Sequence, residues 1–239
     1  MKRRLNRSLP AYPQIGVAST CRSYREYADM FALEESRLSE GSVLDVAGGA
    51  SSFVARLREM GLRAMAADPF YEGDRETILA AAAKEVEVSS SKIKSMKDVY
   101  DWSYYGSPER HQALREESLG RFAADFRSED AGSRYVAASL PNLPFADGEF
   151  STVVCSHFLF LYGDRFDEAF HRSSLEEMLR VTQSGGEVRV YPLVDLNWEI
   201  CPYIQNIMAW VNPAADAELV PSRLPFIPKP SPVLVLRKR

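Results

Sequence analysis

Short apolar runs alternate with segments of helical periodicity along most of this chain. The runs at residues 42–46 and 62–67 flank a segment, 52–60, whose apolar positions recur at helical spacing. Regular alternation of strands and helices predicts a doubly wound, mostly parallel α/β sheet of about seven strands with helices on both faces. We expect strands at 42–46, 62–67, 134–138, 151–156, 187–193 and 232–237, and helices at 52–60, 109–127 and 165–182.

Three other segments complete a single predicted domain over residues 1–239. Residues 1–18 have no period and are expected to form an irregular arm. Residues 19–38 carry apolar side chains at i, i+3, i+4 spacing and predict one amphipathic helix over the cofactor edge of the sheet. Residues 212–232 contain five prolines and predict an extended connection.

Residues 72–133 form a long insertion between the second and third predicted strands. Its first part, from Asp74, is helical in pattern, and the serines at 89–91 are expected to interrupt the helix. A long segment near the carboxyl ends of parallel strands is well placed to cover a substrate as a lid. The alternative is a structural helical hairpin that buries its own aromatic side chains. These aromatics are Tyr100, Trp102, Tyr104 and Tyr105.

Composition and charge limit the possible partners. The 239 residues are 46% hydrophobic and 26% charged, as in an ordinary globular protein, and no apolar run approaches the length of a membrane span. The formal net charge of −4 argues against nucleic acid as a partner. Three widely spaced cysteines give no framework for disulfides or zinc, so we expect a cytoplasmic protein without a metal site. The basic residues 1–7 lack a following apolar stretch, which argues against a secretory signal.

The chemistry is concentrated where the first two strands end. Asp45 lies in the first strand, and the small residues 47–52 follow it directly. A turn of small residues lets a ligand approach the backbone, and a helix beginning there offers free N–H groups. Asp68 ends the second strand, where a carboxylate can accept hydrogen bonds from a ribose diol. The sequence therefore predicts a site for an adenosine-type cofactor.

These motifs resemble those of the class I S-adenosylmethionine-dependent methyltransferases that act on small molecules. The turn resembles the Asp/Glu-x-Gly-x-Gly-x-Gly motif, with Ala47 and Ser51 at two of its glycine positions and Gly49 at the third. Residues 143–150, Leu-Pro-Phe-Ala-Asp-Gly-Glu-Phe, resemble the segment before the fourth strand of the family. Residues 175–190 resemble the helix, Gly-Gly turn and fifth strand that follow.

The resemblance implies S-adenosyl-L-methionine as the cofactor and names the residues that contact it. Asp45 and the turn would line the methionine and ribose, Asp68 would bind the ribose hydroxyls, and Pro69 would border the adenine. Ser139 stands where the family often has an aspartate for the adenine amino group. The full set of expected cofactor residues is Tyr27, Asp45, Ala47, Gly48, Gly49, Ser51, Asp68, Pro69, Ser139, Leu140 and Ser156.

The resemblance also implies methyl transfer to a small-molecule acceptor. His157 ends the fourth strand and is the first candidate for a general base, because its pKa lies near neutrality. Tyr162, Tyr104 and Asp164 are further candidates, whereas His111 and His171 are expected at the surface. The accepting atom stays open among O, N, S and C.

Two alternatives remain open. One is a protein of this fold that binds the cofactor but has a non-methylating or regulatory role. The other is a nicotinamide-dependent oxidoreductase, which the missing Gly-x-Gly-x-x-Gly fingerprint disfavours.

Overall fold

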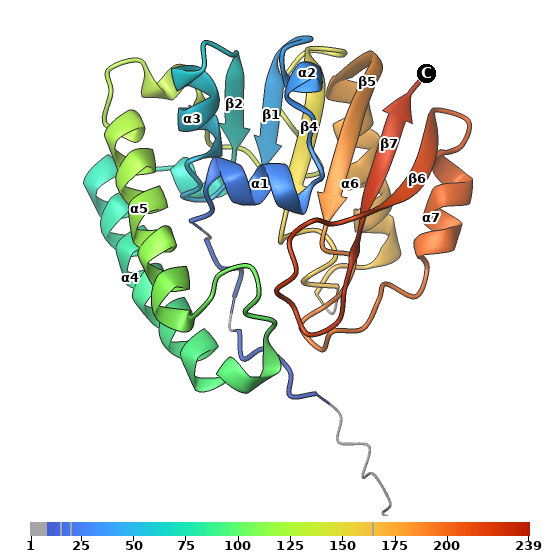
Figure 1. Cartoon of the computed structure of the whole chain (residues 1–239). Helices are drawn as coiled ribbons and strands as arrows, with labels where there is room; N and C mark the ends of the chain where they lie inside the picture. The colour runs from blue at the N-terminus through green and yellow to red at the C-terminus, as the bar shows by residue number, and fades with distance from the viewer. Residues whose placement is uncertain (1–8, 15, 20, 164) are drawn as a thin grey trace, which may run out of the picture.

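A seven-stranded sheet in the order β3-β2-β1-β4-β5-β7-β6 forms the centre of the molecule. The computed structural model describes residues 9–14, 16–19, 21–163 and 165–239 (Figure 1). All neighbouring strands are parallel except β7, which is antiparallel to β5 and β6. The predicted fold class is therefore confirmed. The strands are β1 (Val43–Val46), β2 (Ala64–Ala67), β3 (Tyr135–Val136), β4 (Phe150–Ser156), β5 (Thr182–Tyr191), β6 (Ala215–Pro221) and β7 (Pro232–Lys238).

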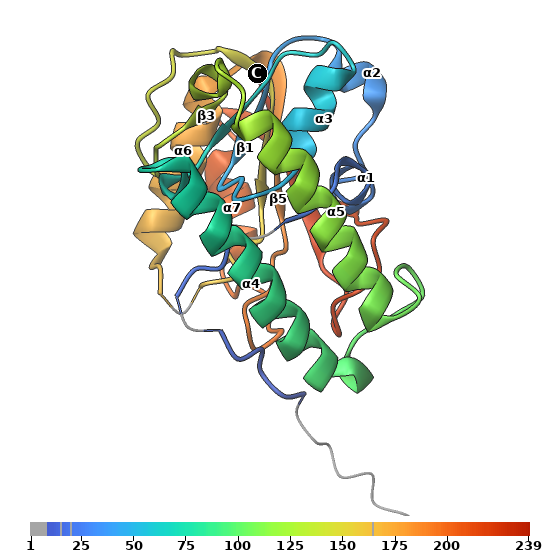
Figure 2. The same ribbon diagram turned by 90° about the vertical axis from the view of Figure 1, so that its left-hand side faces the viewer.

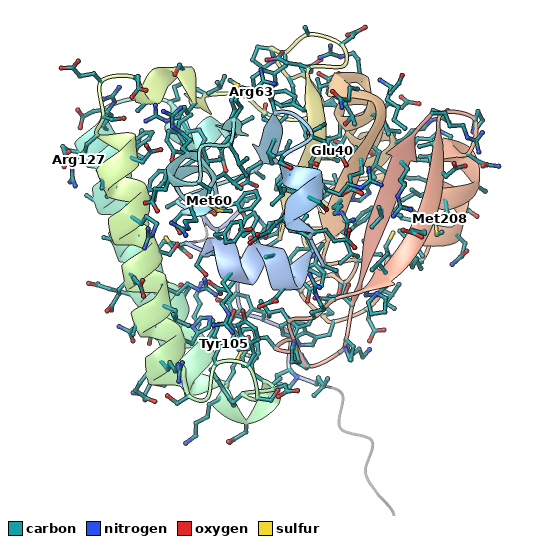
Figure 3. The ribbon with its side chains drawn as sticks, turned by 45° about the horizontal axis from the view of Figure 1, so that its top comes forward. Glu40, Met60, Arg63, Tyr105, Arg127 and Met208 are labelled. Atoms are coloured by element: carbon teal, nitrogen blue, oxygen red, sulfur yellow. The ribbon has the colours of Figure 1, made fainter. Side chains whose placement is uncertain are left out.

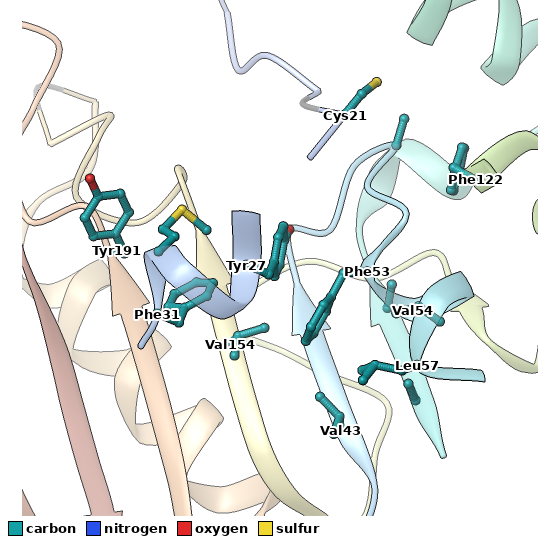
Figure 4. Close-up of a cluster of buried hydrophobic side chains, with 14 of the residues drawn as sticks. Cys21, Tyr27, Phe31, Val43, Phe53, Val54, Leu57, Phe122, Val154 and Tyr191 are labelled. Atoms are coloured by element: carbon teal, nitrogen blue, oxygen red, sulfur yellow. The ribbon is translucent and has the colours of Figure 1, made fainter. Parts of the chain in front are cut away.

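Alternate residues of each central strand face two separate apolar layers. Val43 packs into one layer and its neighbour Leu44 into the other, and the same alternation places Val154 opposite Val153. The first layer is covered by α1 (Tyr24–Met30), α3 (Phe53–Glu59) and the insertion, and the second by α6 (Glu168–Val181) and α7 (Ile204–Val211). In the first layer the rings of Tyr27 and Phe53 stack 4.5 Å apart (Figure 4).

The segment before β1 differs from the single helix predicted over 19–38. Helix α1 begins at a capping box, in which Ser23 and Glu26 exchange hydrogen bonds. The chain then turns at Ala32, whose φ is +53°, before the short helix α2 (Glu35–Leu38). The break keeps α1 short enough to cross the carboxyl-end half of the sheet. Residues 1–8 and 15 of the predicted arm lie outside the described residues.

The carboxyl-terminal part was also predicted incompletely. Helix α7 was missed, and strand β6 lies within the stretch expected to be an extended connection. Proline does not prevent β6, because Pro213 precedes the strand and Pro221 is its last residue. Strand β5 begins at Thr182 rather than at 187, so the helix before it ends directly in the strand.

The insertion is a helical hairpin that projects beyond the carboxyl ends of the strands (Figures 1 and 2). Its helices are α4 (Arg75–Ser95) and α5 (Pro108–Phe126). Asp74 caps α4 and Ser107 caps α5, each accepting a hydrogen bond from an N–H of the first turn. The expected interruption at 89–91 is wrong, since α4 continues through the serines. No helix among the described residues is long and apolar enough to cross a membrane.

Candidate functional site

The turn after β1 has the conformation that its small residues allow. Ala47 and Gly49 both have positive φ, +56° and +54°. The N–H of Ala47 donates to the carbonyl of Ala67 at 2.8 Å, which holds the start of the turn against the end of β2. Because a left-handed conformation is unfavourable for residues with a larger side chain, the turn needs small residues at these two positions.

Asp68 connects β2 to this turn. Its Oδ2 accepts a hydrogen bond from the N–H of Gly49 at 2.9 Å, and its Oδ1 accepts one from the N–H of Phe70 at 2.8 Å. Burial raises the pKa of Asp68, and the two backbone donors oppose that effect. An ionised carboxylate has about four acceptor positions, so a partly exposed Asp68 can still accept two hydroxyl groups.

Asp45 lies behind the turn and is only 1% exposed. The hydroxyl of Tyr27, itself fully buried, donates to Asp45 Oδ1 at 3.3 Å, and burial raises the pKa of Asp45 well above its usual value. Both residues were expected to contact the cofactor. In the structure they are hydrogen-bonded to each other next to the turn.

Sequence reasoning missed Tyr71, which also fixes the turn. Its hydroxyl donates to the carbonyl of Gly49 at 2.8 Å. A Cβ on Gly48 would lie 2.9 Å from the same hydroxyl and 3.1 Å from Asp45 Oδ2. The glycine at 48 is therefore required by packing within the protein, rather than by the approach of a ligand.

The first N–H groups of α3 are not free, contrary to expectation. The N–H of Ser52 donates to the carbonyl of Arg22, and that of Phe53 donates to Ser51 Oγ. Ser51 Oγ also donates to the carbonyl of Arg22, at 2.9 Å. Ser51 was expected to contact the cofactor, but it is 4% exposed and attaches the segment before α1 to the turn.

The remaining predicted cofactor residues lie where β2, β3 and β4 end. Pro69 and Ser139 are exposed, whereas Leu140 packs into the apolar layer beneath α6. Ser156 is buried, with its Oγ 3.0 Å from His157 Nδ1. Of the predicted set, the residues with accessible surface are Ala47, Asp68, Pro69 and Ser139.

His157 has an unusual backbone conformation at the end of β4. Its φ is +52°, and its N–H donates to the carbonyl of Tyr191 at 2.7 Å. Burial, followed by the nearby charges of Arg22 and Arg115, lowers the pKa of His157 well below 6.5. The imidazole is therefore neutral at physiological pH, and its lowered pKa makes it a weaker base than a free histidine side chain.

A cavity of about 100 Å³ lies beside His157, beyond the carboxyl ends of β4 and β5. That volume holds several water molecules. Five parts of the chain enclose it: the segment before α1, the hairpin, the loop after β4, the loop after β5, and the loop between β6 and β7. Residues of its wall include Tyr12, Arg22, Glu85, Tyr100, His111, Arg115, His157, Tyr162, Trp198 and Phe226.

The candidate bases do not all reach this cavity. His157 and Tyr162 line it, but Tyr104 does not, because its hydroxyl donates to Asp29 Oδ2 at 2.7 Å on the outer side of α1. Asp164 lies outside the described residues. His111 and His171 are 3% and 0% exposed, so the expectation that both lie at the surface is wrong.

A buried ion pair joins α1 to the hairpin at the cavity wall. Nη1 and Nη2 of the Arg115 guanidinium both donate to Glu26, which also accepts from the hydroxyl of Tyr105 at 2.6 Å. Burial alone would raise the pKa of Glu26, but the charge and hydrogen bonds of Arg115 hold it at about 2. Tyr105 and Arg127, labelled in Figure 3, lie near opposite ends of α5.

The hydrogen-bonding groups of the site fit S-adenosylmethionine. Asp68 keeps acceptor capacity for the ribose hydroxyls, and Ala47 in the adjoining turn is partly exposed. Pro69 and Ser139 are exposed beside Asp68, where β2 and β3 end. Ser139 offers a hydroxyl at the expected adenine edge, beside the exposed Asn142.

Comparison with known proteins gives three kinds of match. The profile of a family described as a methyltransferase domain matches residues 111–190. An uncharacterized protein of Methanocaldococcus jannaschii, MJ0045, is 29% identical over 188 residues, which are 78% of this chain and 82% of that protein.

Solved structures with related folds include a TehB-like S-adenosylmethionine-dependent methyltransferase of Corynebacterium glutamicum and the N-methyltransferase NodS of Bradyrhizobium japonicum in complex with S-adenosylhomocysteine. The first is 12% identical with a TM-score of 0.45 and covers 83% of this chain and 80% of that chain. The second is also 12% identical with a TM-score of 0.45 and covers 84% and 82% of the two chains.

The strand order is that of the class I methyltransferase fold, and the turn after β1 and the carboxylate after β2 lie together at the carboxyl edge of its sheet. Over residues 111–190 the chain is similar to the family described as a methyltransferase domain.

Proposed function

We propose that the protein transfers a methyl group from S-adenosylmethionine to a small molecule bound in the cavity beside His157. The observation that supports this most is the position of the cavity. It lies beyond the carboxyl ends of β4 and β5, the edge where an open α/β sheet binds its ligands. The hairpin and the segment before α1 leave room for a small acceptor rather than for a macromolecule.

In this proposal the cofactor lies along the ends of β1, β2 and β3. Asp68 accepts the ribose hydroxyls, the backbone from Ala47 to Gly49 follows the methionine and ribose, and Pro69 and Ser139 border the adenine. When bound, S-adenosylmethionine supplies an electrophilic methyl group. Tyr27, Tyr71 and Asp45 keep the turn in shape from below, which reduces the cost of ordering it on binding.

His157 is the residue placed to receive a proton from the acceptor. It lines the cavity, its ring is neutral, and its hydrogen bond to Tyr191 fixes the backbone at the end of β4. Tyr162 is the second candidate, but its hydroxyl already accepts a hydrogen bond from the N–H of Ala18 at 2.9 Å. Methyl transfer itself needs alignment of the acceptor, and a base contributes only where the acceptor carries a proton.

The hairpin serves as the cover of the acceptor. Of the four aromatics in its connection, Tyr100 lines the cavity. Its ring stacks on Phe226 at 4.6 Å, which joins the hairpin to the loop between β6 and β7. This cover would exclude water from the methyl group.

The direct test is methyl transfer itself. The protein is incubated with S-adenosylmethionine carrying a labelled methyl group and the small-molecule fraction of an extract of its own organism. We expect a labelled small molecule, and production of S-adenosylhomocysteine at a rate that Asp68→Asn lowers. Calorimetric binding of S-adenosylhomocysteine without any labelled product from such fractions would instead support the non-methylating alternative.

A further inference from the structure

The cavity wall carries a positive charge, that of Arg22, which has no hydrogen-bond or ion-pair partner among the described residues. The side chain of Arg22 lines the cavity, and its Nη1 is shielded from solvent. Burying this Nη1 is costly, because it has lost water without gaining an acceptor. Burial, and then the nearby charge of Arg115, lowers the pKa of Arg22.

The neighbouring carboxylate cannot neutralise this charge. Glu26 is fully engaged, since it accepts from Arg115, Tyr105 and Ser23. The cluster of Arg22, Arg115 and Glu26 therefore keeps one net positive charge against the cavity. Glu85, on the α4 side, also lines the cavity, but no ion pair joins it to Arg22 among the described residues.

His111 adds a hydrogen-bond donor to the same wall. Arginine only donates, so the contact of 3.3 Å between Arg115 Nη2 and His111 Nε2 makes Nε2 the acceptor. Burial lowers the pKa of His111 to about 3, and the neutral ring therefore carries its proton on Nδ1. That Nδ1–H has no partner among the described residues, although His111 is 97% buried, with an exposed fraction of 3%.

We infer that the acceptor carries an oxyanion, a carboxylate or a phosphate, which Arg22 and His111 receive at one end of the cavity. The inference rests on the proposed function, since it names the class of molecule that is methylated. An oxyanion would pair the charge of Arg22 and accept from both donors. Glu85, on α4, favours a hydrogen-bond donor on the acceptor and opposes a second negative charge. Tyr12, Tyr100, Trp198 and Phe226 give the middle of the cavity an aromatic surface.

The test uses three small probes of similar shape: benzoate, phenyl phosphate and benzamide. Binding is measured by calorimetry on the full chain saturated with S-adenosylhomocysteine, so that the cofactor site is filled. We expect benzoate or phenyl phosphate to bind at least tenfold more tightly than neutral benzamide. Whether benzoate or phenyl phosphate binds more tightly distinguishes a carboxylate from a phosphate acceptor. Equal affinity of all three probes, or binding of none, would overturn the inference.

A second experiment repeats the binding measurements on the variant Arg22→Gln. It should lose the preference for the anionic probe, Arg22→Lys should keep part of it, and Arg110→Gln, an exposed residue of α5, should change nothing. Arg22→Gln should also leave the melting temperature unchanged or raised, because it removes an unpaired cation. If Arg22→Gln instead weakens S-adenosylhomocysteine binding tenfold and leaves the probes unaffected, the arginine serves the cofactor and the inference is wrong.

The two proposals fail separately. A chain that binds benzoate through Arg22 but transfers no label refutes the proposed methylation and keeps the oxyanion site. A chain that labels only neutral or cationic molecules refutes the oxyanion acceptor and keeps the methylation.

Discussion

Asp68 at the end of β2 accepts a hydrogen bond from the backbone N–H of Gly49 in the turn after β1. Two adjacent parallel strands are thus joined at their carboxyl ends by a contact between a side chain and a backbone group. The contact orders the turn before any ligand arrives, and it holds the carboxylate at the edge where we propose that the ribose binds. Two predictions concern these two residues.

Replacing Asp68 by Asn should weaken binding of S-adenosylmethionine about tenfold or more. The change keeps the size of the side chain but removes the charge and one of the acceptor oxygens, and charge-assisted hydrogen bonds contribute about 1.5–3 kcal/mol. Calorimetry with S-adenosylhomocysteine measures the effect. Asp74→Asn, at the exposed cap of α4, is the matched control and should leave the affinity as it is. Unchanged affinity in Asp68→Asn would show that another residue binds the ribose.

Replacing Gly49 by Val should abolish cofactor binding in a protein that still folds. The φ of Gly49 is +54°, a conformation that a β-branched residue strongly disfavours, and the added side chain stands on the turn that the ligand must approach. Gly61→Val controls for strain, because Gly61 has a φ of +78° and open space around it at the end of α3. Both variants should lose similar stability on thermal unfolding. If both bind the cofactor equally well, the turn is not part of the site.

The pair formed by Glu26 and Arg115 should be worth far more to stability than an exposed pair. Arg115→Met leaves a carboxylate that is 1% exposed without its partner, so we expect a loss of about 3–5 kcal/mol in the free energy of unfolding. Arg37→Met breaks an exposed pair with Glu40 and should cost about 0–1 kcal/mol. Denaturant unfolding of the two variants gives both values, and equal losses would contradict the structure.

The same pair should make the free energy of unfolding depend on pH in the acidic range. The folded pKa of Glu26 is about 2, below the ordinary value of 4.5, so its contribution is present above pH 4.5 and is lost as the pH falls toward 2. In Arg115→Met this decrease in the free energy of unfolding toward acidic pH should become smaller.

His111 should make the fold less stable as the medium becomes mildly acidic. Its folded pKa of about 3 lies below the ordinary 6.5, so between these values the unfolded chain binds a proton that the folded protein does not. The free energy of unfolding then falls with decreasing pH by about 1.4 kcal/mol per pH unit for one such proton. His111→Asn should reduce the slope between pH 6 and 4, measured by urea unfolding. An identical slope would mean that His111 is charged in the folded state.

The connection of the hairpin should be more open without ligand than with it. Lys94 and Lys97 are exposed at the end of α4, and trypsin should cleave the free protein there first. We expect S-adenosylhomocysteine to slow this cleavage if the hairpin acts as a lid. Equal rates with and without the ligand would favour a fixed structural hairpin, which the ion pair between Glu26 and Arg115 already holds at one end.

The sequence by itself determined the sheet and the cofactor edge. The apolar runs at 43–46 and 64–67 are buried on both faces, and such runs are typical of parallel strands that continue into helices. Asp45, the small-residue turn and Asp68 are close together in the chain, so their spacing alone indicated an adenosine site. Local signals also gave the hairpin, whose caps at Asp74 and Ser107 are visible in the sequence.

Which residues line the cavity proposed for the acceptor depends on the tertiary structure alone. Arg22, Glu85, His111 and His157 come from four distant parts of the chain, and no local spacing relates them. The polar neighbours of His111 on α5 predicted a surface position. Arg115, one turn further along α5, pairs with Glu26 of α1, and this face of α5 is therefore buried. Hydrophobic periodicity can be seen in a local stretch of sequence, but pairing between distant charges depends on the tertiary structure. The cavity could not be predicted for this reason.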